Sequence, residues 1–272
     1  MNQNKIILVF FTFILAACTP KQVALEERFG YQLVNSEDHK LATKTFGKGN
    51  VTIILEAGLN TQCKTWIDSG IVSNLEKHAK VIIYSRPGIY PSDNSEHPAN
   101  ISNMIKDLDA VINKLAKGEK LILVGHSLGG VIIRAYSIKY PKKVDGLVFV
   151  DTAHEVFIDA TQEEVIAHLS DMGVPDTDPY YKEMIEMRNT LEYISNIGTL
   201  PDIPVISLSA LGLEKDPLDN KERRLLKELN DDLSIGLSDF TNIEVSDSGH
   251  FIQNDQPDIL ISAILDVLRK IK

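Results

Sequence analysis

Residues 125–129 (GHSLG) are the segment of this 272-residue chain whose residue types and spacing could do chemistry. The serine at their centre, Ser127, has a glycine two residues before it and another two residues after it. An aliphatic run, residues 121–124, precedes the segment, and a second apolar run, residues 131–140, follows it. A serine on a tight turn between a buried strand and a helix presents its hydroxyl as a nucleophile.

The two glycines make such a turn possible. Gly125 and Gly129 lack the Cβ atom that would collide with the strand or with the helix. The serine between them is expected to adopt a strained backbone conformation. The helix that follows would point its N-terminus at the serine and favour negative charge there. We therefore predict that Ser127 is a nucleophile rather than an ordinary turn serine.

The elements that must position this serine alternate between buried strands and helices from residue 51 onward. Continuous aliphatic and β-branched runs predict strands, and apolar residues at helical spacing predict helices. Such alternation is typical of a parallel sheet with helices on both faces. The predicted strands are residues 51–55, 81–84, 121–124, 147–150, 205–208 and 243–245, preceded by two short strands within 31–46; the predicted helices are 101–116, 131–140, 219–233 and 259–271.

The interval between the strands at 147–150 and 205–208 is too long for one crossover connection. It contains polar, helix-compatible sequence at 162–170 and 180–194. We predict that residues 152–200 form a helical cap, inserted into a core made of residues 29–151 and 201–272.

At this point the chain resembles the α/β-hydrolase family over nearly all of its length after the N-terminal leader. Four segments carry the resemblance: the serine turn, and residues 56–59 (EAGL), 85–92 (SRPGIYPS) and 248–251 (SGHF). Residues 56–59 follow a central strand, at a place where the family often has His-Gly-x. Residues 85–92 resemble the family's D-R-x-G-x-G-x-S loop. Two positions depart from the pattern, since Glu56 replaces a histidine and Tyr90 replaces a glycine.

The resemblance implies an α/β-hydrolase fold, a mostly parallel central sheet with helices on both faces and a small helical cap. It implies that Ser127 attacks a carbonyl carbon and that His250, between the last strand and the last helix, is the base. The backbone N–H groups of Leu59 and Leu128 would form the oxyanion hole. The expected reaction is hydrolysis of an ester, with amides and lactones as alternatives, and no cofactor is implied.

The acid of this triad has two candidate positions. Asp151 directly follows the strand at 147–150, where some dehalogenases of this fold carry their acid. Asp216 follows the strand at 205–208, the commoner place, but it comes several residues later than the family spacing. Asp151 could instead cap a helix, and Asp216 could be a solvated charge beside Lys215. We predict Asp151, with Asp216 as the alternative.

Other functions stay open for the same residues. The triad could hydrolyse a carbon–carbon bond or transfer an acyl group to an alcohol. The chain could also be a noncatalytic ligand-binding lipoprotein that keeps the fold. Glu56 could serve as a hydrogen-bonding support for the oxyanion loop.

The N-terminus predicts export and lipid attachment. Lys5 is followed by a twelve-residue apolar stretch, residues 6–17, which is too short to span a bilayer. Its last residues and Cys18 resemble the bacterial lipoprotein signal, in which the cysteine is acylated, with palmitate for example, and becomes the first mature residue. We predict a signal peptide at 1–17, a linker at 18–28 and a membrane partner held through the lipid. An ordinary signal peptide or an uncleaved anchor is the alternative.

The residue after the lipidated cysteine bears on location. Thr19 is not the aspartate that commonly retains lipoproteins at the inner membrane. The expected site is therefore the outer membrane, on its periplasmic side or at the surface, if the source is Gram-negative.

The composition of the chain also indicates which classes of binding partner are expected. The net charge of −10 and the pI of about 5.2 argue against a nucleic-acid binder, which needs a basic face. The seven histidines show no metal-ligand spacing, so no metal is predicted. Cys63, the second of two cysteines, is expected to be buried packing rather than a nucleophile. The expected partner at the site is a small-molecule substrate.

Overall fold

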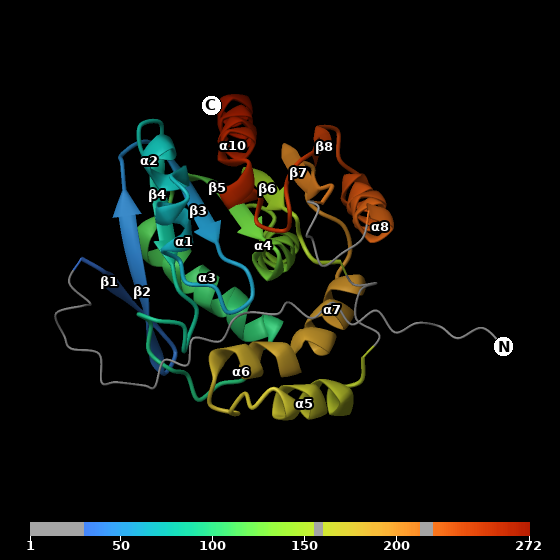
Figure 1. The fold of residues 1–272 in the computed structure, drawn as a ribbon. Coiled ribbons are helices and arrows are strands. Elements are labelled where there is room, and N and C mark those ends of the chain that lie inside the picture. Colours follow the sequence, from blue (N-terminus) through green and yellow to red (C-terminus); the bar gives the residue numbers. More distant parts are fainter. Residues whose placement is uncertain (1–29, 155–159, 213–219) are drawn as a thin grey trace.

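A computed structural model describes residues 30–154, 160–212 and 220–272 of the chain. Its centre is one sheet of eight strands in the order β1-β2-β4-β3-β5-β6-β7-β8 (Figure 1). The strands are β1 (Gln32–Ser36), β2 (His39–Phe46), β3 (Val51–Glu56), β4 (Lys80–Tyr84), β5 (Lys120–His126), β6 (Gly146–Val150), β7 (Val205–Ala210) and β8 (Phe240–Val245).

Most of the sheet is parallel. β1 and β2 form an antiparallel hairpin, and β2 pairs antiparallel with β4. The strands from β4 to β8 in the sheet order all run parallel to their neighbours. Every residue of β3, β6 and β7 is buried, as expected for parallel strands that are covered on both faces. The predicted fold class is therefore confirmed.

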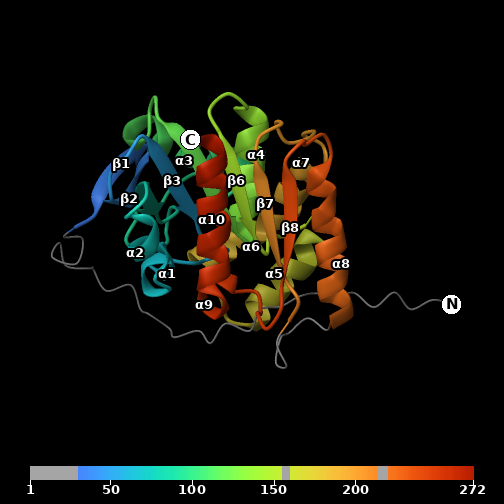
Figure 2. The same ribbon diagram turned by 90° about the horizontal axis from the view of Figure 1, so that it is seen from above.

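Helices cover both faces of this sheet (Figure 2), where α10 lies across the face opposite to α4. They are α1 (Thr65–Asp68), α2 (Ile71–Leu75), α3 (Ile101–Leu115), α4 (Leu128–Lys139), α5 (Gln162–Asp171), α6 (Pro179–Ile185), α7 (Met187–Ser195), α8 (Asn220–Asp231), α9 (Ile252–Asp255) and α10 (Pro257–Ile271), with a 3₁₀ turn at Asp232–Ser234. None of the helices in the described residues is long and apolar enough to cross a membrane.

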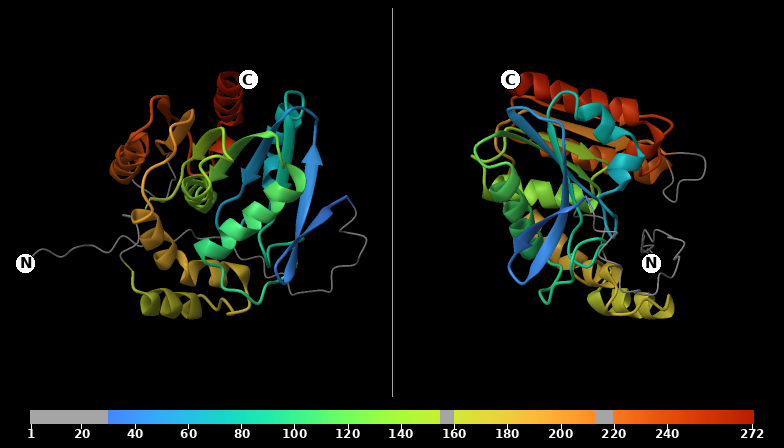
Figure 3. Two further views of the ribbon diagram at one scale, coloured as in Figure 1. Left: turned by 180° about the vertical axis from the view of Figure 1, so that it is seen from behind. Right: turned by 90° about the vertical axis from the view of Figure 1, so that its left-hand side faces the viewer.

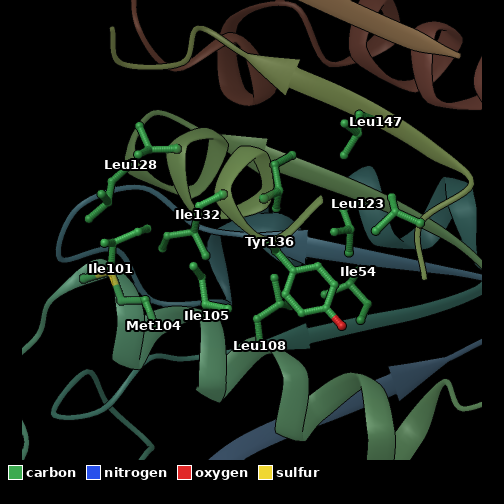
Figure 4. Packing of buried hydrophobic residues seen from close by; sticks show 14 of the residues in the cluster. Ile54, Ile101, Met104, Ile105, Leu108, Leu123, Leu128, Ile132, Tyr136 and Leu147 are labelled. Atoms are coloured by element: carbon green, nitrogen blue, oxygen red, sulfur yellow. The ribbon is translucent and has the colours of Figure 1, made fainter. Parts of the chain in front are cut away.

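Two apolar cores lie on opposite faces of the sheet because successive strand residues point in opposite directions. Ile54 and Leu123 belong to the core under α3 and α4, where Ile105, Ile132 and Tyr136 pack against them (Figure 4). Their strand neighbours belong to the second core, which α2 and α10 cover. The two cores hold the carboxyl ends of the parallel strands in a fixed arrangement.

Three helices between β6 and β7 form a layer beside the sheet (Figure 3). α5 begins with a capping box in which Thr161 and Glu164 bind each other's backbone N–H. Around Val165, Leu169 and Tyr180 these helices have a small apolar core of their own. α7 joins the main core through Leu191 and its neighbours. We refer to α5, α6 and α7 as the cap helices.

Some element bounds differ from the predictions. α4 begins at Leu128 rather than at residue 131, because Gly129 and Gly130 are needed for close packing although both weaken a helix. The predicted run 180–194 forms two helices, α6 and α7, that meet at Glu186. β8 begins at Phe240, since an edge strand with one exposed side does not need a continuous apolar sequence.

Candidate active site

Ser127 lies at the junction of β5 and α4 in a backbone conformation that residues other than glycine rarely adopt. Its φ is 53° and its ψ is −119°. Such conformations cost on the order of 1–3 kcal/mol and persist only where neighbours hold them. Here the Ser127 N–H donates to Val150 O at 3.1 Å, and Gly130 N–H donates to Ser127 O at 2.9 Å. The strained serine is thus held by the neighbouring strand β6 and by the first turn of α4.

The glycines around Ser127 are required by close approach. A Cβ at Gly125 would lie 2.4 Å from the carbonyl oxygen of Gly129. A Cβ at Gly129 would lie 2.5 Å from the carbonyl oxygen of Glu56. The end of β5, the start of α4 and the end of β3 therefore touch through backbone atoms alone.

Asp151 and His250, the predicted acid and base, are in contact. Asp151 directly follows β6, and His250 lies between β8 and α9. The distance between His250 Nδ1 and Asp151 Oδ2 is 2.7 Å. An ionised carboxylate only accepts hydrogen bonds, so Nδ1 carries the proton. In the neutral ring Nε2 is then the nitrogen that can take a proton from a substrate or a nucleophile.

Asp151 is fully buried and receives three donors. Its Oδ2 also accepts from Arg223 Nη1 at 2.6 Å, and its Oδ1 accepts from Ala210 N–H at 3.0 Å. Burial raises the pKa of Asp151, but the hydrogen bond to His250 and the charges of His250 and Arg223 outweigh it. The net result is a pKa below the usual aspartate value. Asp151 is therefore ionised at neutral pH.

Arg223 was not singled out from the sequence. It lies on α8 in the charged run 221–224, which is typical of a solvent-exposed helix face. Its side chain is nonetheless buried. The sequence signal for this burial is the helical spacing of Arg223 from Leu226, one turn later. Leu226 and Asn230, one and two turns after Arg223, are buried on the same face of α8.

His126, within the serine turn, binds the backbone of His250, the predicted base. Its ring lies beside that of His250, with centroids 4.6 Å apart. Its Nε2 is 2.8 Å from the carbonyl oxygen of His250, so Nε2 carries the proton and donates. Burial and the nearby His250 lower the pKa of His126 to about 3. His126 is therefore neutral at physiological pH and positions His250 without competing for its proton.

The predicted oxyanion donors come from two segments next to Ser127. Leu128 is the first residue of α4, where backbone N–H groups have no partner within the helix. Leu59 lies on the loop after β3. A Cβ at Gly58, one residue earlier, would be 3.3 Å from Ser127 Cβ. Both donors thus belong to backbone that closely surrounds the serine.

Together these residues gather at one edge of the sheet. Ser127 and Asp151 follow the carboxyl ends of the neighbouring parallel strands β5 and β6, where open α/β sheets bind their ligands. Within the residues that the structure describes, no three His, Cys, Asp or Glu side chains are placed to hold a metal ion. Asp216 and Cys18 lie outside the described residues.

The family model of the alpha/beta hydrolase fold matches residues 51–185, from β3 to the end of α6. This match, the parallel sheet and the helices on its two faces show that the chain has the α/β-hydrolase fold.

One sequence relative and two solved structures match most of this chain. The uncharacterized protein YqjL of Bacillus subtilis (strain 168) is 25% identical over 226 residues, which cover 81% of this chain and 85% of YqjL. The enol-lactonase from Burkholderia xenovorans LB400 superposes with a TM-score of 0.65 at 17% identity, covering 88% of this chain and 100% of that one. A thermophilic esterase from Thermogutta terrifontis gives a TM-score of 0.62 at 18% identity, covering 89% and 98%.

Proposed function

We propose that this chain is a serine hydrolase that cleaves an ester or a related acyl bond. The single observation that carries the proposal is the contact between the buried, ionised Asp151 and His250, whose ring also lies beside that of His126, the residue before the strained Ser127. Ser127, His250 and Asp151 are the three groups that a nucleophilic acyl transfer needs, a nucleophile, a base and an acid that orients the base.

In the proposed reaction, Ser127 Oγ attacks the carbonyl carbon while His250 Nε2 takes the hydroxyl proton. The carbonyl oxygen becomes an oxyanion, which the N–H groups of Leu59 and Leu128 stabilise. The imidazolium then gives its proton to the leaving alcohol, and an acyl-enzyme remains. Water repeats the sequence with His250 as base and releases the acid.

An ester is the bond that we favour. The two solved structures compared above are described as an enol-lactonase and an esterase, and a lactone is a cyclic ester. Ser127 keeps only 8% of its surface exposed and the His250 side chain 11%. Access this narrow suits a small-molecule substrate, and the cap helices are the elements that would select it.

The test is labelling with a fluorophosphonate, which reacts with activated serines. We expect the wild-type chain to be labelled and Ser127→Ala to be unlabelled, while Ser195→Ala, which removes an exposed serine on α7, keeps the label. Hydrolysis of p-nitrophenyl esters should follow the same order. Persistent labelling of Ser127→Ala would remove the basis of the proposal. Ester product formed with an added alcohol would instead favour acyl transfer.

We also propose that the chain is exported and anchored to the bacterial cell membrane through a lipid on Cys18. The support is the sequence, a charged start, an apolar stretch and Leu-Ala-Ala directly before the cysteine. Cells that express the chain with an alkyne analogue of palmitate should incorporate the label, and Cys18→Ser should lose it and leave the membrane fraction. Cys63→Ser is the matched control. Equal labelling of wild type and Cys18→Ser would refute the anchor.

A further inference from the structure

A buried group of three ionisable side chains lies under the loop that carries Leu59. Arg86, from the loop after β4, is flanked by Glu56 at the end of β3 and by Glu183 on α6. Its Nη1 donates to Glu56 Oε1 at 2.8 Å, and its Nε donates to Glu183 Oε1 at 2.6 Å. All three side chains are at most 3% exposed. One guanidinium thus links the core of the fold to a cap helix.

Arg86 also holds the loop by its backbone. Nη1 donates to Ala57 O at 2.7 Å, and Nη2 donates to Gly58 O at 2.6 Å. The C=O of one residue and the N–H of the next share a planar trans peptide and point in opposite directions. The bond to Gly58 O therefore fixes the direction of the Leu59 N–H, turning it away from the guanidinium.

Glu183 holds the same loop on the other side of Leu59. Its Oε2 accepts from Asn60 N–H at 2.7 Å and from Arg86 Nη2 at 3.2 Å. Asn60 has a φ of 48°, a left-handed conformation that needs support from its neighbours. The Leu59 side chain packs against both the main core and the apolar core of the cap helices. The loop is thus clamped between α6 and the sheet.

We infer that Glu183 is a positioning residue for the oxyanion hole, so that α6 completes the catalytic site in addition to covering it. This inference rests on the proposed function. A glutamine at this position offers one amide oxygen in place of two carboxylate oxygens, so either Arg86 Nε or the Asn60 N–H would lose its acceptor, and Arg86 would lose a negative partner. The loop would then reorganise to find new partners, and the Leu59 N–H would lose its fixed direction.

Glu56 does not replace Glu183 in this role. Burial raises the pKa of Glu56 to about 7, although Arg86 and a hydrogen bond from the Tyr84 hydroxyl oppose the shift. Glu56 is therefore partly protonated near neutral pH, which makes it a poorer partner for the guanidinium. Glu183 is also the one of the two that binds the loop directly, at Asn60.

A purely structural ion pair would behave differently on substitution. It would lower the stability but leave the kcat of the folded enzyme unchanged. A positioning residue lowers kcat with little change in KM, because the oxyanion forms only in the transition state. Removal of one oxyanion donor typically costs roughly one hundred- to one thousandfold in kcat. We expect a loss of about ten- to one hundredfold for Glu183→Gln, since the donor is misdirected rather than absent.

The experiment compares the full chain, purified in detergent, as wild type, Glu183→Gln and Glu163→Gln. Glu163 is an exposed glutamate on α5 and is the matched control within the cap helices. Three assays are made: steady-state kinetics with p-nitrophenyl butyrate for kcat and KM, inhibition by an alkyl trifluoromethyl ketone, and hydrogen exchange in residues 57–61. The ketone adduct carries an oxyanion, so the inhibition constant of the ketone should rise by about the factor by which kcat/KM falls.

For Glu183→Gln we expect the lower kcat, the weaker inhibition and faster exchange at the Asn60 amide, while Glu163→Gln matches the wild type in all three. A folded Glu183→Gln enzyme with kcat within twofold of wild type would overturn the inference. So would Asn60 exchange that does not respond to the substitution, and this readout does not depend on activity. A wild-type chain that neither hydrolyses esters nor reacts with the fluorophosphonate would refute the proposed function itself. If hydrogen exchange at Asn60 still depended on Glu183 in that case, Glu183 would only hold the loop, and its proposed effect on catalysis would be refuted.

Discussion

Replacement of Asp151 by asparagine tests the acid of the proposed triad. The carboxylate accepts from His250 and Arg223 on Oδ2 and from the Ala210 N–H on Oδ1. The amide of asparagine offers one acceptor and one donor in the same space. If its oxygen faces His250 and Arg223, its NH₂ group meets the Ala210 N–H. If it turns over, the NH₂ group meets the other two donors. Either orientation leaves at least one buried donor unpaired.

The size of the effect follows from these contacts. A buried donor without a partner costs about 1–3 kcal/mol. Breaking a buried ion pair from one side costs about 3–5 kcal/mol, and here the Arg223 charge loses its carboxylate. We expect a total loss of about 3–5 kcal/mol, because the amide oxygen still accepts some of the bonds. For a domain of this size, that loss lowers Tm by about 10 °C.

Catalysis should suffer more than stability. The buried negative charge stabilises the imidazolium that forms when His250 takes the serine proton, and it selects the tautomer with the proton on Nδ1. Loss of both is worth roughly a ten-thousandfold fall in kcat in a serine triad. We expect kcat/KM for p-nitrophenyl butyrate to fall by about one thousand- to ten thousandfold in Asp151→Asn.

The assay compares Asp151→Asn with Asp216→Asn at a temperature at which circular dichroism shows both variants folded. We expect Asp216→Asn to keep kcat/KM within about threefold of wild type, since Asp151 already occupies His250 Nδ1. If Asp216→Asn instead lost more than about one hundredfold while Asp151→Asn kept most of the activity, the reasoning from the His250 contact would be refuted.

Two further predictions concern stability. In the folded state the pKa of Glu56 is raised from 4.5 to about 7. The protonated form of Glu56 therefore stabilises the folded chain fully below about pH 4.5, and this stabilisation is lost as the pH rises through 7. The change in the free energy of unfolding is at most about 3 kcal/mol. Chemical unfolding at pH 5 and pH 8 should therefore show wild type losing stability relative to Glu56→Gln, and parallel pH curves would contradict this. Gly125→Ala should destabilise the chain by more than about 2 kcal/mol and abolish fluorophosphonate labelling, because its Cβ would lie 2.4 Å from Gly129 O; a soluble variant with wild-type melting temperature and labelling would contradict it.

The parts of the fold that the sequence predicts well are those with a strong local signal. Buried parallel strands require unbroken aliphatic runs, so residues 121–124 and 147–150 identify β5 and β6 directly. The start of α4 was misplaced for a physical reason. Gly129 and Gly130 have low helix propensity, and only the contacts of Gly129 with the backbone at the end of β3 and of Gly130 with Thr152 explain why two glycines stand in the first turn of this helix.

The residues that support the predicted site could not be found in the same way. Arg223 and Asp151 are 72 residues apart in sequence, and Arg86 and Glu183 are 97 apart. Arg223 and Glu183 each lie on a helix where the residues directly before and after them are partly or fully exposed, and one sequence does not say which charge in such a segment turns inward. Arg86 lies in the segment 85–92 that resembles the family loop, but its partners come from β3 and a cap helix, so its role depends on tertiary contacts.

The two buried arginines have a common consequence for how this site works. Arg223, on α8, binds Asp151, the proposed acid, and Arg86 binds the proposed oxyanion loop together with Glu183 from α6. Both depend on helices outside the strand–turn–helix unit that carries Ser127. A buried guanidinium has few alternative partners. A change in α8 would therefore alter the geometry of the proposed acid, and a change in α6 that of the proposed oxyanion hole, while the G-x-S-x-G segment stays intact. Turnover should thus be more sensitive to α6 and α8 than the sequence motifs alone suggest.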